Sequence, residues 1–482
     1  MSSLTNISNN YKNIKSALIL FFLSLIAAFA ISKGGFIALG ALVAIPVLGI
    51  VIYKIFNYPA FGIILILYIA FSINGSGKYV ELPFGLLVDF MLFLTAIAAI
   101  FYVKKKELSI LTNGTVLLTS IWFFYCVLEL VNPEPHSYEG WFYAVRASAL
   151  YLFVTVILCF LVFNKEKDLD TFFNIWFLGS LIGALYGLKQ LYLGLNSAEH
   201  LWVTTVGATT HLIFGQLRVF SIYSDAGQFG AIMGYTAVVG IILGIKNKSR
   251  NKKLFFIITS ILCLYGMVIS GTRGATFIPI VGFLCYFVLS KNFKVVVIGL
   301  VVLGSIFGIL KFTFIGQDNY NIQRLRSSVN PTEDLSFQVR LKNQAKLKEY
   351  LASRPFGGGI GTIGYWGEKF MPGTFLAETP PDSWYVLLWG ETGVVGLVIY
   401  FSMLLYILGR SFLKIFVMPD SYMKQKLIAL FCGLVGIVVA SYANPVLGQM
   451  PCSIHFYLSI VFLHMGTTYW VKKPDETQLN AS

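Results

Sequence analysis

Runs of about twenty apolar residues recur from one end of this chain to the other. A helix of that length is long enough to cross about 30 Å of hydrocarbon. Hydrophobic residues make up 57% of the sequence and charged residues only 12%, far from the composition of an average soluble domain. The sequence therefore predicts an all-α polytopic membrane protein with about 12 to 14 transmembrane helices.

Fourteen spans can be read from the apolar runs. They are residues 16–32, 35–54, 59–73, 82–103, 114–131, 141–163, 171–193, 226–245, 254–270, 274–290, 294–312, 384–408, 426–445 and 453–470. The short run 59–73 is also compatible with a re-entrant helix. No cleavable signal peptide is expected, because the first run lacks a small-residue cleavage site and leads directly into the second.

Lysine and arginine gather at the N-terminus and after every even-numbered span. The clusters are KKK at 104–106, NKEK at 164–167, KNKSRNKK at 246–253, KNFK at 291–294, Arg410 with Lys414, and VKK at 471–473. Short basic loops stay on the cytoplasmic side of a membrane, so both termini are predicted to be cytoplasmic. These anchors explain most of the net charge of +14, and nucleic-acid binding is not expected.

This topology predicts three regions. A helix bundle occupies 1–312, with an outer loop at about 194–225. A large extracytoplasmic loop occupies 313–383, and residues 384–482 add the last helices and a short cytoplasmic tail. A loop of that size is often functional. Within it, residues 335–355 predict one basic, partly amphipathic helix that ends near a proline.

The stretch RPFGGGIGTIGYWG, at 354–367, places Gly359, Gly361 and Gly364 in the spacing of a dinucleotide-binding turn. That spacing has force only when the glycines follow a strand and open a helix inside a βαβ unit. Here they follow a predicted helix in a loop too short for such a fold, so no dinucleotide site is expected. The glycines either make a tight turn or let the backbone approach a ligand.

Metal and redox chemistry find no support in the sequence. The chain has no CxxC, HExxH, P-loop or GxSxG pattern, and its five histidines lack metal-ligand spacing. Five of the six cysteines fall in predicted spans, so a disulfide framework is not expected. The sequence predicts no metal and no cofactor, and gives no support to an ATP-driven pump or a serine hydrolase.

Ionisable residues inside the spans collect near their outer ends. They are Asp89, Glu129, Arg146, Lys189 and Arg273. Charges in a membrane are costly and usually functional, so this asymmetry predicts a polar chamber that opens outward. The alternatives are headgroup snorkelling for Lys189 and Glu129, and a structural pair between Asp89 and Arg146.

Four motifs occur in order between about residues 215 and 405. They are RVFSIYSDAGQFGAIMGY at 218–235, SGTRGA at 270–275, RPFGGGIG at 354–361 and PPDSWYVLLWGETGVVGLVIYF at 380–401. In this order and topology they resemble the O-antigen ligase and O-antigen polymerase superfamily of bacterial membrane glycosyltransferases. The resemblance implies a donor glycan on undecaprenyl diphosphate at the outer face of the bacterial cytoplasmic membrane. The implied acceptor is another lipid-linked glycan for a polymerase, or lipid A–core for a ligase.

Residue chemistry suits such a donor. Arginine is always charged and holds phosphate oxygens with a planar fork, so Arg218, Arg273 and Arg340 are candidates for binding the diphosphate. Guanidinium groups can stabilise the charge of the leaving group, and no metal is then needed. Lys342 and Lys346 either add attraction or form a solvated basic face.

The acceptor hydroxyl needs a base. Ligases of this family carry a His, usually followed by Asn, where this chain has Asp382 and Ser383. Asp382 is the candidate base of an inverting displacement, or alternatively the N-cap of the following helix. The departure favours a polymerase over a ligase, and Glu391 is predicted to be a structural partner for a loop donor.

The remaining candidates for lining the substrate cavity are Asp225, Asp89, Arg146, Gly359 and Gly361. A lipid-linked glycan flippase is a further alternative. It should carry charges on both sides of the membrane midplane, and the inner halves of these spans carry almost none. Glycan transfer is the favoured function.

Overall fold

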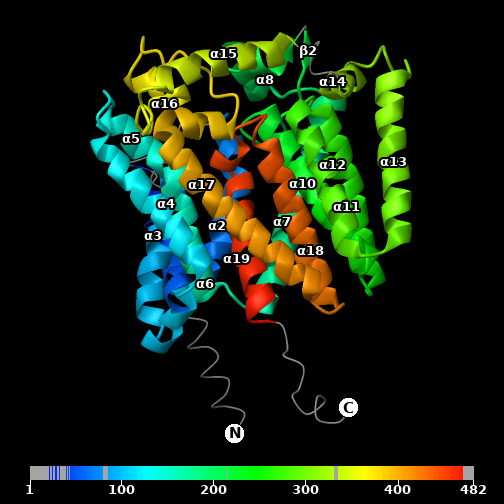
Figure 1. Ribbon diagram of the computed structural model, residues 1–482. Helices are drawn as coiled ribbons and strands as arrows, with labels where there is room; N and C mark the ends of the chain where they lie inside the picture. The colour runs from blue at the N-terminus through cyan, green and yellow to red at the C-terminus, as the bar shows by residue number, and fades with distance from the viewer. Residues whose placement is uncertain are drawn as a thin grey trace, which may run out of the picture.

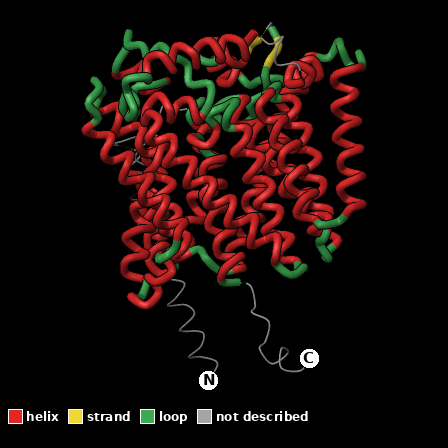
Figure 2. Tube along the Cα trace, in the orientation of Figure 1, coloured by secondary structure: helices red, strands yellow, loops and turns green. Residues whose placement is uncertain are grey.

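The computed structural model describes residues 44–79, 85–213, 215–329 and 335–470, with isolated positions between 21 and 42. These residues are helical apart from turns, loops and one antiparallel hairpin of β1 (Leu212–Ile213) and β2 (Gln216–Leu217). Figures 1 and 2 show a bundle of long helices with several short helices gathered at one end. The predicted all-α polytopic fold is confirmed.

The helices follow one another along the chain with short connections. In order they are α2 (Ala60–Ser76), α3 (Gly85–Tyr102), α4 (Gly114–Leu128), α5 (Tyr138–Val145), α6 (Tyr151–Val162), α7 (Glu166–Tyr192), α8 (Ser197–Thr205), α9 (Ala208–His211), α10 (Ala226–Ile245), α11 (Arg250–Ile269), α12 (Arg273–Ser290), α13 (Phe293–Phe312), α14 (Tyr320–Val329), α15 (Leu335–Leu351), α16 (Gly364–Phe370), α17 (Trp384–Val417), α18 (Tyr422–Ala440) and α19 (Cys452–Thr468).

Ten helices in the described part of the chain are long and apolar enough to cross a membrane. They correspond one to one with the predicted spans from 82–103 to 426–445. Shorter apolar helices, Ala44–Asn57 and Ala60–Ile73, lie where spans 35–54 and 59–73 are predicted. The last predicted span is α19, whose residues are buried along almost their whole length. Most of the first, 16–32, falls outside the described residues.

Helix α10 forms the centre of the bundle. It packs against α11, α12 and α18, and 89% of its most apolar 18-residue stretch is buried. Its glycines permit this close packing, as small residues do in membrane helices. A Cβ at Gly240, for example, would lie 2.2 Å from Oγ of Ser260 on α11. Helix α13 is the opposite case, because no residue of its most apolar 18-residue stretch is buried. It stands at the edge of the bundle (Figure 1).

The two ends of the bundle carry different connections. At one end, Nζ of Lys426 lies 2.6 Å from Oδ1 of Asp170, and Nζ of Lys291 lies 3.9 Å from the ring centroid of Phe416. Short basic loops meet there. At the other end lie α8, α14, α15, α16 and the hairpin (Figure 1). The two long loops, 194–225 and 313–383, therefore share the end opposite to these basic connections.

The predicted helix at 335–355 is confirmed as α15, which ends four residues before Pro355. In the second half of α15, one face is buried, because Leu347 and Leu351 pack against Ile363 and Leu376. Lys342 and Lys346 are exposed on α15, which agrees with a solvated basic face.

Helix α17 is broken near its start. Gly393 has φ 63° and ψ −166°, which is outside helical geometry. The loop fills the break, because the amide of Val395 donates to the carbonyl of Pro355 at 3.2 Å. The amide of Gly358 likewise donates to the carbonyl of Gly390 at 2.9 Å. Segment 355–359 of the large loop thus supplies backbone partners to a membrane helix.

Candidate functional site

Arg218 is held at the loop-bearing end of the bundle by the β1–β2 hairpin. Its amide donates to the carbonyl of His211 at 2.8 Å, which continues the hairpin beyond the two strands. Its side chain then reaches across to the turn between α11 and α12. There Nη2 donates to Oγ1 of Thr272 at 3.1 Å, and Nε lies 3.4 Å from the carbonyl oxygen of Ser270. The first two arginine motifs of the sequence therefore meet.

The α11–α12 turn also receives an arginine from the large loop. Nε of Arg324, on α14, donates to the carbonyl of Gly271 at 3.2 Å. Gly271 has φ +59°, a conformation that glycine adopts without strain and that turns this carbonyl toward the loop. Arg273 begins α12 two residues later. One turn thus brings three arginines from distant parts of the sequence together.

The three guanidinium groups, those of Arg218, Arg273 and Arg324, form what we call the arginine cluster. Burial, together with repulsion from Arg324 and Arg273, lowers the pKa of Arg218 to about 10, and Asp225 opposes the change. Arg218 still carries its proton at neutral pH. Cations held close together repel one another, so the cluster is matched to an anion with several oxygens, such as a diphosphate.

Asp225 lies beside the cluster but has a structural task. Its Oδ1 accepts from the amide of Gln228 at 2.9 Å and caps the first turn of α10. Its Oδ2 accepts from Oγ of Ser224 at 2.9 Å. The carboxylate is therefore engaged on both oxygens.

Asp382 ends the large loop and is paired with α15. Its Oδ2 lies 3.4 Å from Nε of Arg340, and the two side chains keep 42% and 29% of their surface exposed. Nε of Arg340 makes no hydrogen bond among the described residues, so this contact is an ion pair without a well-directed bond. An exposed pair of this kind stabilises little and exchanges readily.

The alternative that Asp382 caps the following helix is wrong. Ser383 is the N-cap of α17, and its side chain accepts from the amides of Tyr385 and Val386. A serine hydroxyl in extended backbone geometry suits that position as well as a carboxylate would. The Asp382 side chain pairs with Arg340 and does not cap α17.

Residues 441–449, between α18 and α19, connect the arginine cluster with Asp382. The amide of Trp384 donates to the carbonyl of Ser441 at 2.9 Å, two residues beyond Asp382. On the other side, a Cβ at Gly274 would lie 2.5 Å from Nδ2 of Asn444. The glycine next to Arg273 therefore lets the Asn444 side chain sit against α12.

The glycine turn is structural. The amide of Gly361 donates to Oε1 of Glu391 at 2.8 Å, which confirms the prediction that Glu391 pairs with a loop donor. Gly359 and Gly361 have φ +93° and +84°. A Cβ at Gly361 would lie 2.4 Å from the carbonyl of Gly140, so the turn packs directly on α5. These glycines serve close backbone packing.

Asp89 and Arg146 form the structural pair that was the alternative to a polar chamber. Nη1 of Arg146 lies 2.6 Å from Oδ2 of Asp89, and the hydroxyl of Tyr151 donates to Oδ1 at 2.6 Å. Arg146 begins a π-helical turn, Arg146–Leu150, between α5 and α6. Such turns are frequent at functional sites, because they re-aim side chains.

The other two charges near the span ends also have partners. Glu129 accepts from Nδ2 of Asn132 at 2.5 Å, and Nζ of Lys189 lies 3.4 Å from Oε2 of Glu199.

Among the described residues, no group of three or more His, Cys, Asp or Glu side chains could hold a metal ion. The six cysteines are free. The arginines are therefore the groups at this site suited to bind an anion.

Sequence reasoning missed two members of this arrangement. Arg324 lies in a stretch, QRLRSS at 323–328, that has no motif of its own. Asn444, in SYANP at 441–445, follows the last of the four motifs. The available signal for Arg324 was an arginine inside the long loop 313–383, and only the packing of Gly274 singles out Asn444.

Comparison with known proteins identifies the family of one segment of the chain. The O-antigen ligase family, Wzy_C, matches residues 258–401. The match covers just under a third of the chain and includes Arg273, Arg324, Arg340 and Asp382, whereas Arg218 lies before it. A comparison with curated proteins gave no match. The protein is a multi-pass membrane glycosyltransferase that carries an O-antigen ligase family domain, with the glycan transfer typical of ligases and polymerases of that family.

Proposed function

We propose that this enzyme transfers a glycan from undecaprenyl diphosphate to an acceptor glycan at the outer face of the bacterial cytoplasmic membrane. The observation that carries the proposal is the arginine cluster. Arg218, Arg273 and Arg324 come from three separate segments and meet at one turn. A lipid diphosphate has the charge and the spread of oxygens that such a cluster can bind.

The cluster would act on the leaving group. As the glycosidic bond breaks, negative charge grows on the diphosphate, and fixed guanidinium groups stabilise that charge more in the transition state than in the ground state. The proposed mechanism is therefore independent of metal. It calls for no group beyond the arginines on the donor side.

Asp382 is the proposed base on the acceptor side. Segment 441–449 contacts both Trp384, two residues beyond Asp382, and Gly274, next to Arg273. An inverting displacement would place the base and the leaving group on opposite faces of the sugar. Arg340 is proposed to pair with Asp382 in the free enzyme and to turn to the diphosphate when donor binds. The weak, exposed geometry of the pair supports such an exchange.

The charges of the bundle support an orientation in the membrane. The basic connections gather at the end opposite to the arginine cluster, and short basic loops favour the cytoplasm. We therefore place both termini in the cytoplasm and the arginine cluster outside.

Polymerisation of O-antigen or a related surface polysaccharide is the proposed outcome. The His–Asn pattern of family ligases is replaced here by Asp382 and Ser383, which favours a polymerase over transfer to lipid A–core. A strain lacking the protein tests this choice. Single lipid-linked repeat units should accumulate for a polymerase, whereas accumulation of finished lipid-linked polymer would indicate a ligase.

A further inference from the structure

Three aromatic rings from α5 and α16 lie nearly parallel at the loop-bearing end of the bundle. The centroid of Tyr143 is 4.8 Å from that of Trp366, with an angle of 14° between the ring planes. Phe370 lies 5.8 Å from Tyr143 at 9°, and 6.0 Å from Trp366 at 18°. All three side chains are half-buried. We call these three rings the aromatic platform.

Charged and hydroxyl groups surround the platform. Cζ of Arg146 lies 5.0 Å from the centroid of Tyr143, and the same guanidinium is paired with Asp89, which also binds Tyr151. Nζ of Lys369 lies 5.7 Å from Trp366. The π-helical turn that begins at Arg146 thus sets a donor beside the rings, and Asp89 on α3 adds an acceptor.

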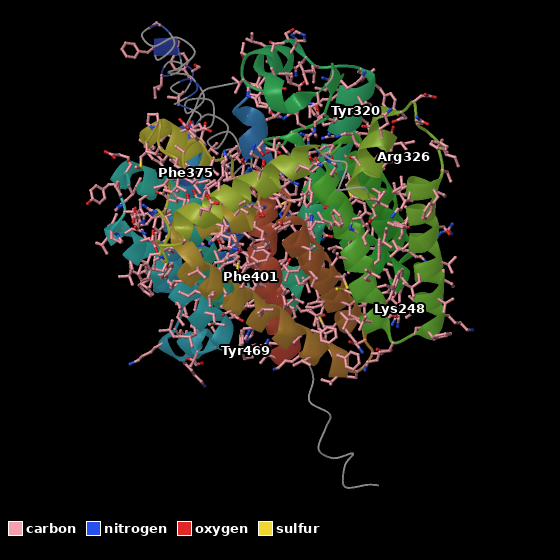
Figure 3. The ribbon with its side chains drawn as sticks, turned by 45° about the horizontal axis from the view of Figure 1, so that its top comes forward. Lys248, Tyr320, Arg326, Phe375, Phe401 and Tyr469 are labelled. Atoms are coloured by element: carbon pink, nitrogen blue, oxygen red, sulfur yellow. The ribbon has the colours of Figure 1, made fainter. Side chains whose placement is uncertain are left out.

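The platform is joined to the loop that carries the proposed base. Helix α16 begins at Gly364, where a Cβ would lie 2.8 Å from Cγ of Pro381, the neighbour of Asp382. Helices α5 and α16 lie at one side of the loop-bearing end, and α14 with Arg324 lies at the other (Figure 1). Figure 3 turns this end forward, with Phe375 near α16 and Arg326 on α14 marking the two sides. The platform is therefore remote from the arginine cluster.

We propose that the aromatic platform, with Arg146, Asp89 and Tyr151, is a carbohydrate-binding subsite for the acceptor glycan. This inference rests on the proposed function, because the acceptor is defined by the transfer reaction. The faces of aromatic rings are negative and attract the C–H groups on the flat side of a pyranose ring. Hydroxyl groups at the rim of the sugar can then bond to charged side chains, which form the stronger hydrogen bonds.

Aromatic residues at the end of a membrane bundle also serve as interfacial anchors. An anchoring ring is expected to be largely exposed, as Tyr365 is at 66%. The three platform rings are instead half-buried against one another, next to a charge pair that lipid would not solvate. A sugar, which is apolar on its face and polar at its rim, fits both features.

The test measures glycan binding separately from transfer. The full protein is reconstituted in lipid nanodiscs and titrated with oligosaccharides. These are released by mild acid from the surface polysaccharide of the bacterium that produces the protein. Binding is followed by calorimetry and saturation-transfer NMR for the wild type, Trp366→Leu, Tyr143→Leu and Asp89→Asn. Leucine removes the ring face but keeps apolar volume. Tyr138→Leu is the matched control, since Tyr138 lies on α5, is 67% exposed and contacts His136 instead of the platform.

The wild type should bind the oligosaccharides. Trp366→Leu, Tyr143→Leu and Asp89→Asn, together called the platform variants, should each raise the dissociation constant at least about tenfold. Tyr138→Leu should stay within about twofold. In transfer assays the platform variants should raise the acceptor KM while kcat at saturation changes little. Trp366→Phe should recover part of the affinity, which separates loss of the ring face from misfolding.

The proposal is overturned if the wild type fails to bind the oligosaccharides, or if the leucine variants bind them as well as the wild type does. The same holds if Trp366→Leu and Tyr138→Leu impair membrane insertion equally while binding stays unchanged, which would identify the rings as membrane anchors. Arg273→Ala separates the two hypotheses. It should abolish transfer but keep oligosaccharide binding, and retained transfer would refute the diphosphate site without touching the subsite.

Discussion

Oδ2 of Asp382 lies 3.4 Å from Nε of Arg340, so the proposed base is paired across the loop with helix α15. The pair is half-exposed and lacks a directed hydrogen bond. Asp382 can therefore exchange this cation for an acceptor hydroxyl at little cost. The neighbouring Ser383, which caps α17, provides the natural comparison.

Asp382→Asn should keep donor binding and thermal stability but transfer glycan at least about 100-fold more slowly, because an amide lacks the basicity of a carboxylate. Ser383→Ala should do the reverse. It removes the cap and should cost about 1 kcal/mol of stability, with transfer by the folded enzyme retained. Initial rates and thermal unfolding of both purified variants check this prediction. A fully active Asn variant would move the search for the base to His200 or His211.

Replacing either Arg218 or Arg273 with alanine should abolish transfer while membrane insertion stays normal, since each change removes stabilisation of the diphosphate. Arg273→Lys should restore only part of the rate, because an ammonium group lacks the bidentate fork. Transfer from lipid-linked donor in nanodiscs measures all three. Wild-type rates in both alanine variants would mean that the donor site lies elsewhere.

Arg324 and Arg326 on α14 form a matched pair for the same question. Arg324 bonds to the carbonyl of Gly271 in the arginine cluster, whereas Arg326 bonds to the carbonyl of Ile315 within the loop. Arg324→Ala should reduce transfer at least about tenfold, and Arg326→Ala should leave it near the wild-type rate. Equal losses in the two variants would argue that α14 acts only through its fold.

Transfer activity should survive exhaustive treatment with EDTA, because the proposed stabilisation comes from guanidinium groups. The measurement is the initial rate before chelation, after it, and after addition of magnesium or manganese. Activity that is lost on chelation and returns with either ion would refute the metal-free mechanism.

Gly361→Ala should destabilise the protein far more than Gly373→Ala does. Both glycines have positive φ, of +84° and +80°. The Cβ of an alanine at 361 would also meet the backbone of Gly140 at 2.4 Å, whereas a Cβ at position 373 would have no described atom within 4 Å beyond its chain neighbours. The backbone strain alone costs about 1–2 kcal/mol, and the collision adds to it. Thermal unfolding of the two variants gives the difference, and equal losses would contradict the packing of the turn on α5.

Acid should destabilise the protein through His211. Burial lowers the pKa of His211 from 6.5 to about 4, so the folded protein keeps the imidazole neutral where the unfolded chain protonates it. The unfolded chain then binds more protons between these two values, and stability is lost as the pH falls through this range. The loss approaches about 3 kcal/mol. Thermal unfolding at about pH 7.5 and about pH 4.5 should show this fall, and His211→Gln should reduce it.

Sequence reasoning located the spans because each needs about twenty apolar residues whatever its neighbours are. It also paired Asp89 with Arg146 and assigned Glu391 to a loop donor, since buried charges need partners. It missed Arg324 and Asn444, because their positions depend on how the long loop and the α18–α19 connection fold back on the bundle. Nothing local distinguishes Asp382 from Ser383 as the cap of α17, and that alternative was decided by the hydrogen bonds that Ser383 accepts from the first amides of α17.

Because α17 is broken at Gly393, the large loop and that membrane helix depend on each other and should be exchanged between relatives only together. Segment 355–359 donates to and accepts from the backbone on both sides of the break, at Gly390 and Val395. A loop transplanted from a relative without its own helix would meet a mismatched break and leave backbone groups without partners inside the membrane. Exchange of acceptor specificity between such enzymes, by recombination or in the laboratory, should therefore succeed only when loop and helix move together.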